Sequence, residues 1–409
     1  MCLKPALPGA EARPDSVEVA DIFRAHGEAY RRTHPLARCQ RRAMRAIEAC
    51  RTSQLGGHKH ICDRCGAVRL TYNSCRNRHC PKCQTLDRQR WVEARQLDLL
   101  PVTYFHVVFT LPHQLNVLAQ THPRVIYNLL FTAASDTLLT FGRDAKHLGG
   151  TLGITAVLHT WGRNLSQHIH LHCIVTGGAL SADGSRFIHS RSTFLFPVHA
   201  LSKVFKAKVL DALDQAFRAG HLTAPQQDTD SDASSNVSSL MAGLRSCDWV
   251  VYCKPPLAGP QQVLGYLGRY SHRVAISNDR ILSFKEGLVR FRWKDHADDG
   301  KPKVMTLAAE EFIRRFLLHV LPHGFMRIRH FGLLANRTRN KKLALCRQLL
   351  DQPAASDTPA PESTRTMMMR LTGLDITLCP VCRQGRLQLT AIIPPHTSPS
   401  SRPALLDTS

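Results

Sequence analysis

The chain has 409 residues, 43% of them hydrophobic, so it is long enough and apolar enough to bury the cores of two or three domains. Lys and Arg number 54 against 31 Asp and Glu, a formal net charge of +23. This excess predicts a nucleic-acid partner, because basic side chains neutralise phosphates and release their counterions. No run of 18 apolar residues exists, so a membrane span is not expected.

The amino terminus, residues 1–14, has no apolar stretch before a small-residue cleavage site, so it does not predict a secretory signal. We therefore expect a cytoplasmic protein associated with the bacterial nucleoid. In that reducing compartment, metal binding explains the 14 cysteines better than a disulfide framework does.

Residues 17–50 carry a helical periodicity and include four arginines spaced three and four residues apart: Arg38, Arg41, Arg42 and Arg45. This spacing places the four guanidinium groups on one helical face, which could lie along a phosphate backbone. An ordinary solvated face is the alternative.

Residues 50–84 contain too few large apolar side chains to form a core unaided. Two CxxC pairs fourteen residues apart, Cys62 with Cys65 and Cys80 with Cys83, predict a four-thiolate structural Zn²⁺ site, and the bound metal would supply folding free energy. Arg76 and Arg78 lie between candidate ligands and could be held toward DNA. A second zinc or another ligand set stays open, because the segment also contains Cys50, His58, His60, Cys75 and His79.

Residues 104–111 predict a buried strand and residues 123–142 an amphipathic helix. Residues 152–161 and 168–175 predict an antiparallel hairpin that ends at the Gly177-Gly178 pair, and this order of elements predicts an α+β fold. Because side chains alternate along a strand, one face of the hairpin presents possible metal ligands: His168, His170 and His172. Among 22 histidines such spacing is a weak signal by itself, and the apolar context strengthens it.

Tyr266 and Tyr270 are four residues apart, so a helix would present both hydroxyls on one side. Packing in a core with the hydroxyls at its rim is the structural alternative. Beside an imidazole-bound divalent cation, a phenol could attack a phosphodiester and leave a 5′-phosphotyrosine and a free 3′ hydroxyl. The attacked phosphate could be bound by neighbouring basic side chains: Arg269, His272 and Arg273.

The carboxyl-terminal half contains further segments with distinct compositions. Residues 223–239 predict a flexible acidic insertion, residues 351–366 a linker and residues 394–409 a disordered tail. Cys379 and Cys382 form a third CxxC, which would need Cys346, a histidine or another subunit to complete a metal site. The segment 327–342 is either a solvated helix or a DNA-backbone contact made through Arg327, Arg329, Arg337 and Arg339.

Four motifs together resemble one family. HLHCIV with its glycine pair, YLGRYSHRVAISN, the cysteine segment CDRCG…YNSCRNRHCPKCQ and the basic RHFGLLANR are similar to motifs of the HUH-class rolling-circle transposases of the IS91 type. The resemblance covers roughly residues 20–350. It implies an amino-terminal zinc-binding DNA-recognition domain at 17–98 and an HUH catalytic domain at 102–346 built on a five-stranded antiparallel sheet flanked by helices. Beyond the segment that the resemblance covers, residues 367–393 are a candidate carboxyl-terminal knuckle because they contain the third CxxC.

The same resemblance implies roles for individual residues. The metal-binding histidines fall on His170 and His172, with His168 or Gln167 as a third ligand or supporting donor, and the catalytic tyrosines fall on Tyr266 and Tyr270. It implies dependence on Mg²⁺ or Mn²⁺ and action on single-stranded or hairpin DNA at transposon ends.

Two other functions remain open from the sequence. A rolling-circle replication initiator or relaxase would use the same site chemistry. A non-enzymatic, zinc-dependent DNA-binding regulator would need the cysteines and the positive charge but neither the histidines nor the tyrosines.

Overall fold

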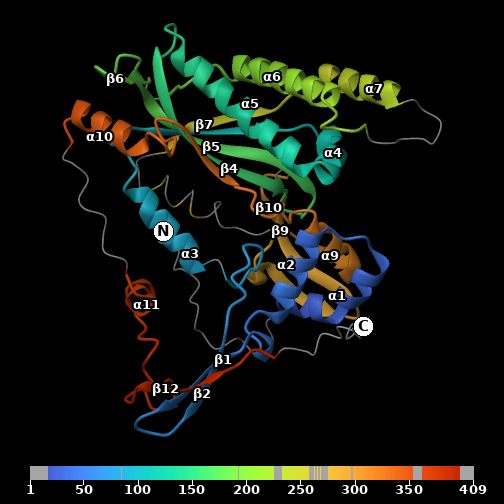
Figure 1. Cartoon of the computed structure of the whole chain (residues 1–409), viewed down its shortest axis with the longest axis vertical. Helices are drawn as coiled ribbons and strands as arrows, with labels where there is room; N and C mark the ends of the chain where they lie inside the picture. The colour runs from blue at the N-terminus through green and yellow to red at the C-terminus, as the bar shows by residue number, and fades with distance from the viewer. Residues whose placement is uncertain are drawn as a thin grey trace, which may run out of the picture.

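The computed structural model describes residues 17–83, 85–191, 193–224, 233–257, 275–295, 298–352 and 362–396, together with Gln262, Gly265 and Gly268. Within them lie a large central sheet, a helical lobe and a small sheet at the far end of the molecule (Figure 1). No helix in this part of the chain combines the length and apolar character needed to cross a bilayer.

The main sheet is antiparallel throughout, in the order β11-β4-β5-β3-β7, with the short β6 paired to β5. This confirms the predicted α+β fold with a central antiparallel sheet. Its strands are β3 (Tyr104–Thr110), β4 (Gly150–Trp161), β5 (Gln167–Ser181), β6 (Phe187–His189), β7 (Val251–Leu257) and β11 (Ile328–Gly332).

Helices cover one face of the main sheet (Figure 1). The inward residues of β3 and β5, such as Phe109 and Leu171, alternate with residues of the opposite face and pack against Phe131 and Phe205 of the helices. This core holds the strands in one register, because a one-residue slip would expose every apolar side chain. The covering helices are α4 (Asn116–Thr121), α5 (Pro123–Arg143), α6 (Val198–Arg218) and α7 (Ala233–Ser246), and the 3-10 turn η2 (His113–Leu115) precedes α4.

The opposite face of the main sheet is only partly apolar. Val157 and Ile174 form a smaller core there with Leu343 and Cys346 of α10 (Arg339–Leu349), and Trp91 of α3 (Thr85–Gln96) packs at its edge. Towards the other end of the same strands this face becomes polar and carries histidines, so the sheet itself positions them.

The helical lobe combines the amino-terminal helices with residues 275–317. Helices α1 (Val19–Thr33) and α2 (Arg38–Ala49) share one hydrophobic core with α9 (Ala309–Leu317) and a three-stranded sheet, and the rings of Phe23 and Phe316 pack edge to face at 5.2 Å. The sheet order is β10-β9-β8, from β8 (Ile281–Lys285), β9 (Leu288–Asp295) and β10 (Lys301–Ala308), with the 3-10 turn η3 (Asn278–Arg280) before β8.

The small sheet has the order β12-β1-β2 and joins segments more than 300 residues apart. Its strands are β1 (Gly57–Cys62), β2 (Val68–Tyr72) and β12 (Leu387–Ile393), with the 3-10 turn η1 (Ser53–Leu55) before β1 and helix α11 (Thr364–Thr372) leading into the segment before β12. Among the described residues, none of these three strands contributes to the apolar cores above, so another interaction must stabilise this sheet.

Three local predictions were wrong. Residues 233–239, predicted to be flexible, begin helix α7, because Met241 and Leu244 anchor that helix in the core of the main sheet. Residues 364–366, predicted to be linker, begin α11, where the Ser363 hydroxyl caps the helix by accepting from the amide of Thr366. The glycine pair at 177–178 lies inside β5 rather than after it.

Candidate metal centres and nucleic-acid interface

Three imidazoles gather on the polar end of the main sheet. His159 of β4 pairs in register with His170 of β5, and His172 follows two residues along the same strand face. Their candidate ligand nitrogens all lie within 4.8 Å of one another. The sheet thus brings the two predicted histidines together with His159, which the sequence analysis missed; we refer to the three as the imidazole cluster.

Hydrogen bonds orient two of these rings. The Nδ1 of His170 donates to the carbonyl oxygen of His168 at 2.9 Å, and the Nδ1 of His172 lies 2.8 Å from the Nε2 of His106 on β3. Both Nδ1 atoms are therefore engaged, and the Nε2 atoms of His170 and His172 are the ones that can bind a metal. His106 is a second residue that the sequence analysis missed.

The cluster favours neutral imidazole. His159 and His172 are 3% and 8% exposed, and loss of solvation lowers the pKa of His170 to about 4. A neutral ring keeps a lone pair available at neutral pH, and this is the form in which histidine binds metals.

The other predicted ligands of this site lie elsewhere. His168 is exposed and outside the imidazole cluster, but its ring packs against that of His170 with centroids 4.8 Å apart, and its carbonyl orients His170. The Oε1 of Gln167 accepts a 2.6 Å hydrogen bond from Gln120.

The predicted tyrosines lie outside the described residues, as do three basic neighbours: Tyr266, Tyr270, Arg269, His272 and Arg273. Between the two tyrosines and just before them, Gly268 and Gly265 are helical, as predicted for this segment. A Cβ on Gly268 would lie 2.7 Å from Cγ2 of Val92, so Gly268 lies close to α3 and a larger residue there would require the Val92 side chain to shift.

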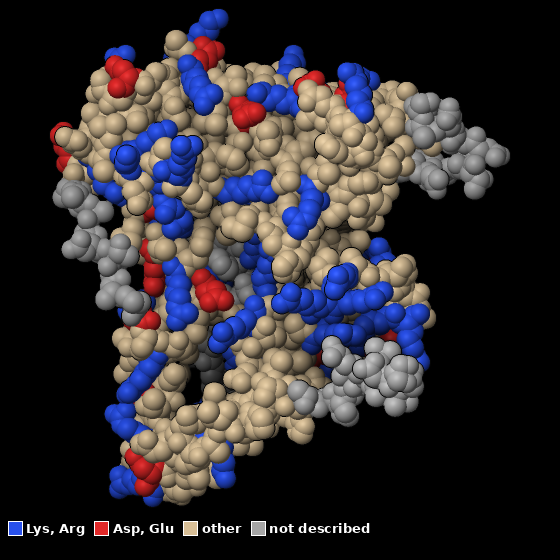
Figure 2. Space-filling view, in the orientation of Figure 1, with Lys and Arg blue, Asp and Glu red and all other residues tan. Residues whose placement is uncertain are grey.

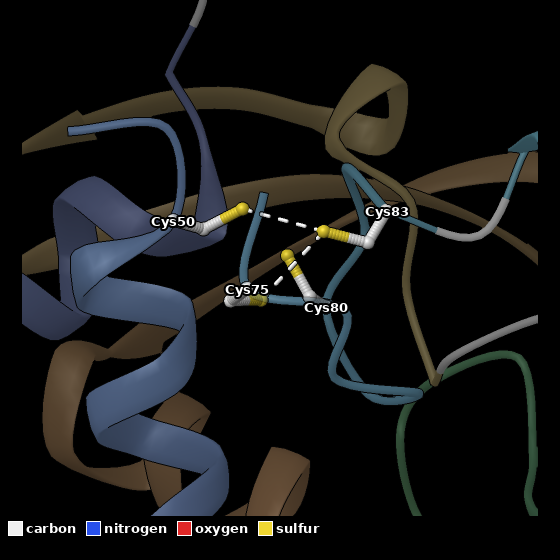
Figure 3. A group of neighbouring side chains, drawn as sticks. All are labelled: Cys50, Cys75, Cys80 and Cys83. Atoms are coloured by element: carbon white, nitrogen blue, oxygen red, sulfur yellow. Dashed lines mark hydrogen bonds between the residues drawn. The ribbon is translucent and has the colours of Figure 1, made fainter. Parts of the chain in front are cut away.

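Four thiols meet at the core of the helical lobe: Cys50, Cys75, Cys80 and Cys83 (Figure 3). Cys50 follows the last residue of α2, and the other three come from the loop that leads to α3. The Sγ atoms of Cys50 and Cys75 lie 3.4 and 3.6 Å from that of Cys83. Sulfurs bound tetrahedrally to zinc at about 2.3 Å are about 3.8 Å apart, so this first thiolate cluster has the dimensions of a structural zinc site.

The remaining CxxC cysteines form a second thiolate cluster, in which Cys62 and Cys65 meet Cys379 and Cys382. The predicted grouping of Cys62 and Cys65 with Cys80 and Cys83 was therefore wrong, because the structure divides these pairs between two clusters. Cys346, suggested as a partner of the carboxyl-terminal pair, is instead buried against the main sheet.

His79 and Arg78 have structural partners. The Nε2 of His79 accepts from the amide of Leu321 at 3.2 Å, and its Nδ1 contacts Asn77, so both ring nitrogens are engaged and burial lowers its pKa to about 3. The guanidinium of Arg78 donates to the carbonyl of Pro322 at 2.8 Å and to that of Phe325. These two residues fasten the cysteine loop to the segment 321–325.

A basic groove lies between α2 and the cysteine loop. It has a volume of about 840 Å³, and it contains no acidic side chain among the described residues that form its walls. We call it the α2 groove; its walls include Arg38, Arg42, Cys75, Arg76, Arg78 and His323. Arg38, Arg42 and Arg76 are exposed, so their guanidinium groups are available to phosphates, as are those of Arg41 and Arg45 on the same helix.

The arginines of the segment 327–342 divide into packed and exposed ones. Arg329 lies over the ring of Phe131 at 4.2 Å and donates to Asn128, and Arg339 pairs with Asp98 at 3.5 Å. Burial lowers the pKa of Arg327 to about 10. Arg337 is exposed, so of these four it is the one most available to DNA.

Lys and Arg side chains are numerous on the face shown in Figure 2, with a dense group over the lobe that carries α1 and α2. Asp and Glu are fewer and scattered. This distribution agrees with the net charge of +23 and gives the α2 groove a basic surrounding.

Comparison with known proteins gives a consistent result for both halves of the chain. A family described as "Transposase zinc-binding domain" matches residues 22–111, and one described as "Putative transposase" matches residues 153–342. The first match contains the first thiolate cluster, and the second contains the imidazole cluster.

Two relatives extend this result. The chain is 50% identical over 395 residues to "Putative transposase y4qJ" of Sinorhizobium fredii (strain NBRC 101917 / NGR234), covering 96% of this chain and 98% of that protein. It is 29% identical over 314 residues to "Transposase for insertion sequence element IS801" of Pseudomonas savastanoi pv. phaseolicola, covering 76% and 74%. No solved structure matches.

The zinc-binding part and the sheet part thus both define a transposase, a protein that acts on DNA. More narrowly, the chain belongs to the IS91 family of transposases.

Proposed function

We propose that this transposase cuts and joins single-stranded DNA at the ends of its element, in rolling-circle transposition through a 5′-phosphotyrosine. The observation that carries the proposal is the imidazole cluster: three imidazoles, brought together by strand register, two of which are oriented by hydrogen bonds to His168 and His106.

The imidazole cluster fits a catalytic metal better than a structural one. Three protein ligands leave coordination positions open, whereas structural sites use four. When bound, a divalent cation supplies a Lewis acid that polarises the scissile phosphate. Of the two predicted ions, Mn²⁺ fits this donor set better, because Mg²⁺ strongly prefers oxygen ligands.

Tyr266 and Tyr270 are the proposed nucleophiles. The phenolic oxygen of one tyrosine forms a bond to phosphorus and loses its proton, while the bond from phosphorus to the 3′ oxygen breaks and that oxygen leaves as a hydroxyl. The covalent phosphotyrosine conserves the energy of the diester, so a later attack by a 3′ hydroxyl rejoins DNA without a nucleotide cofactor.

DNA recognition is proposed for the α2 groove. A structural Zn²⁺ bound by the first thiolate cluster would hold the loop that carries Arg76, and α2 would present Arg38 and Arg42 across from it. Backbone contacts of this kind fix the position of a DNA strand without reading its sequence.

The test uses the full chain, Mn²⁺ and single-stranded oligonucleotides from the ends of the element that carries the gene. We expect a covalent protein–DNA adduct on Tyr266 or Tyr270, lost with EDTA, with both tyrosines changed to Phe, and with His159→Ala or His170→Ala. Tyr252→Phe, on an exposed position of β7, and His189→Ala, exposed on β6, are the matched controls that keep the adduct. An adduct that survives EDTA, or that maps to another residue, would refute the proposal.

A further inference from the structure

The second thiolate cluster uses residues outside both matched family segments, because Cys379 and Cys382 lie beyond residue 342. The Sγ atoms of Cys62 and Cys382 are 3.7 Å apart, as are those of Cys65 and Cys379. All four sulfurs lie within 4.8 Å of one another. Disulfides need a sulfur separation of about 2.05 Å, whereas a tetrahedral zinc site needs about 3.8 Å.

We propose that these four cysteines bind a second structural Zn²⁺, which clasps the carboxyl-terminal segment onto the amino-terminal cysteine module. This inference rests on the thiolate geometry and is independent of the proposed tyrosine chemistry.

The loops around the cysteines are built as two facing knuckles. The amide of Arg64 donates to Sγ of Cys62 at 3.5 Å, and the amide of Gly385 donates to Sγ of Cys382 at 3.3 Å. Such amide donors stabilise thiolates. A Cβ at Gly385 would collide with Sγ of Cys62, so the two knuckles approach as closely as a shared ion requires.

Direct hydrogen bonds join the two knuckles. The amide of Asp63 donates to the carbonyl of Arg386 at 3.0 Å, and the amide of Arg386 donates to the carboxylate of Asp63 at 2.8 Å. The pairing of β12 with β1 continues from this point, so the clasp and the small sheet form one unit.

The small sheet lacks an apolar core, so we expect its stability to depend on the bound Zn²⁺. All five residues of β2 are exposed, and on β12 the side chains of Leu389 and Ile392 are 57% and 73% exposed. Strands with so little apolar burial are marginal in water, and binding of a metal by folded ligands contributes directly to the free energy of folding.

Helix α11, which precedes Cys379 and Cys382 in the chain, contacts helix α3. Arg370 of α11 pairs with Glu93 of α3 at 3.0 Å, and Arg90 donates to Thr364 at 3.1 Å. Exposed pairs of this kind contribute little to stability, so they would not hold the segment without the second ion.

The first test is the zinc content of the full chain, purified under reducing conditions and measured by mass spectrometry. We expect two Zn²⁺ per chain, and one for the double variants Cys379→Ser/Cys382→Ser and Cys62→Ser/Cys65→Ser. The matched control, Cys247→Ser/Cys253→Ser, removes two thiols that belong to neither cluster and should keep two ions.

The second test separates loss of the ion from loss of folding. Cys382→His should retain two ions, because three cysteines and one histidine also bind zinc, whereas Cys382→Ser should retain one. Loss of the second ion should increase the rate at which trypsin cleaves after Arg383 and Arg386 at least tenfold. Equal zinc content in the wild type and in Cys379→Ser/Cys382→Ser would overturn the proposal, as would identical cleavage rates.

Discussion

The imidazole cluster and the two thiolate clusters represent opposite ways of assembling a metal site. The three histidines lie on adjacent strands of the main sheet, whose cores fix the strand register whether or not a metal is bound. The eight cysteines lie mostly on loops and at strand ends. Those of the second thiolate cluster belong to none of the apolar cores, and those of the first join a loop to the core of the helical lobe. We infer that the fold creates the imidazole cluster, whereas bound metal is needed to form the thiolate-bearing parts of the fold.

The imidazole cluster and the thiolate clusters also differ in the number of metal ligands that the protein supplies. Three imidazoles leave positions for a substrate, and four thiolates leave none. A stable scaffold can hold an incomplete coordination shell, but a loop that depends on the metal for folding needs a complete one.

The largest expected difference between the imidazole cluster and the thiolate clusters is in their effect on the stability of the fold. Cys80→Ser should unfold the helical lobe, because Cys80 is 1% exposed in its core and the zinc at stake contributes on the order of 10 kcal/mol, comparable to the whole stability of a domain. Circular dichroism and zinc content measure this loss. His170→Ala, in contrast, should change the melting temperature by only a few degrees.

A buried thiol outside the clusters provides the control. Cys173→Ser, in the core of the main sheet, should cost only about 1 to 3 kcal/mol, the usual penalty for burying a hydroxyl. If His170→Ala unfolds the protein while Cys80→Ser melts like the wild type, the contrast is reversed and our interpretation is wrong.

The next effect concerns His106, which we assign as a positioning residue. A metal on Nε2 of His172 leaves the proton on Nδ1, which then donates to Nε2 of His106. His106→Ala should therefore weaken Mn²⁺ binding ten- to hundredfold, and His106→Gln should restore part of it through its amide oxygen. Titration calorimetry with Mn²⁺ measures both, and His189→Ala, exposed on β6, is the control. Equal affinities in all four proteins would exclude this role.

The smallest effect tests the α2 groove. Arg42→Ala and Arg76→Ala should each weaken binding of single-stranded DNA several-fold and lower the slope of log affinity against log salt by about 0.7, because each removes one phosphate contact. Fluorescence anisotropy at several salt concentrations measures the slope. Arg218→Ala, exposed on α6, should leave the slope unchanged. Unchanged slopes for Arg42→Ala and Arg76→Ala would place the DNA elsewhere.

The sequence correctly predicted those helices and strands in which buried apolar residues recur at regular spacing. The strand at 104–111, the helix at 123–142 and the hairpin at 152–161 and 168–175 all appear with small shifts in their bounds, because local apolar patterns determine these elements. The four-thiolate grouping could not be found in this way, since Cys62 and Cys65 are completed by cysteines more than 300 residues away and local spacing carries no information about that pairing.

The third histidine could have been found only approximately. In a hairpin whose turn lies at 162–166, residues equally far from the turn face each other, which would place His159 opposite Ile169. An irregularity between His159 and Trp161 shifts the register by one residue, so His170 is the actual partner. His106 gave a weaker signal, because which strand lies next to β5 depends on the topology of the whole sheet.

The shared core of the helical lobe limits how members of this family can be recombined. Ile22 and Phe23 of α1 pack in the same core as Phe291 of β9 and Phe312 of α9, although more than 250 residues of chain lie between α1 and either element. A chimera that exchanges only residues 17–50 with a relative would create mismatched packing in this core. An exchange intended to alter which DNA ends are recognised should therefore transplant residues 275–320 along with the amino-terminal helices.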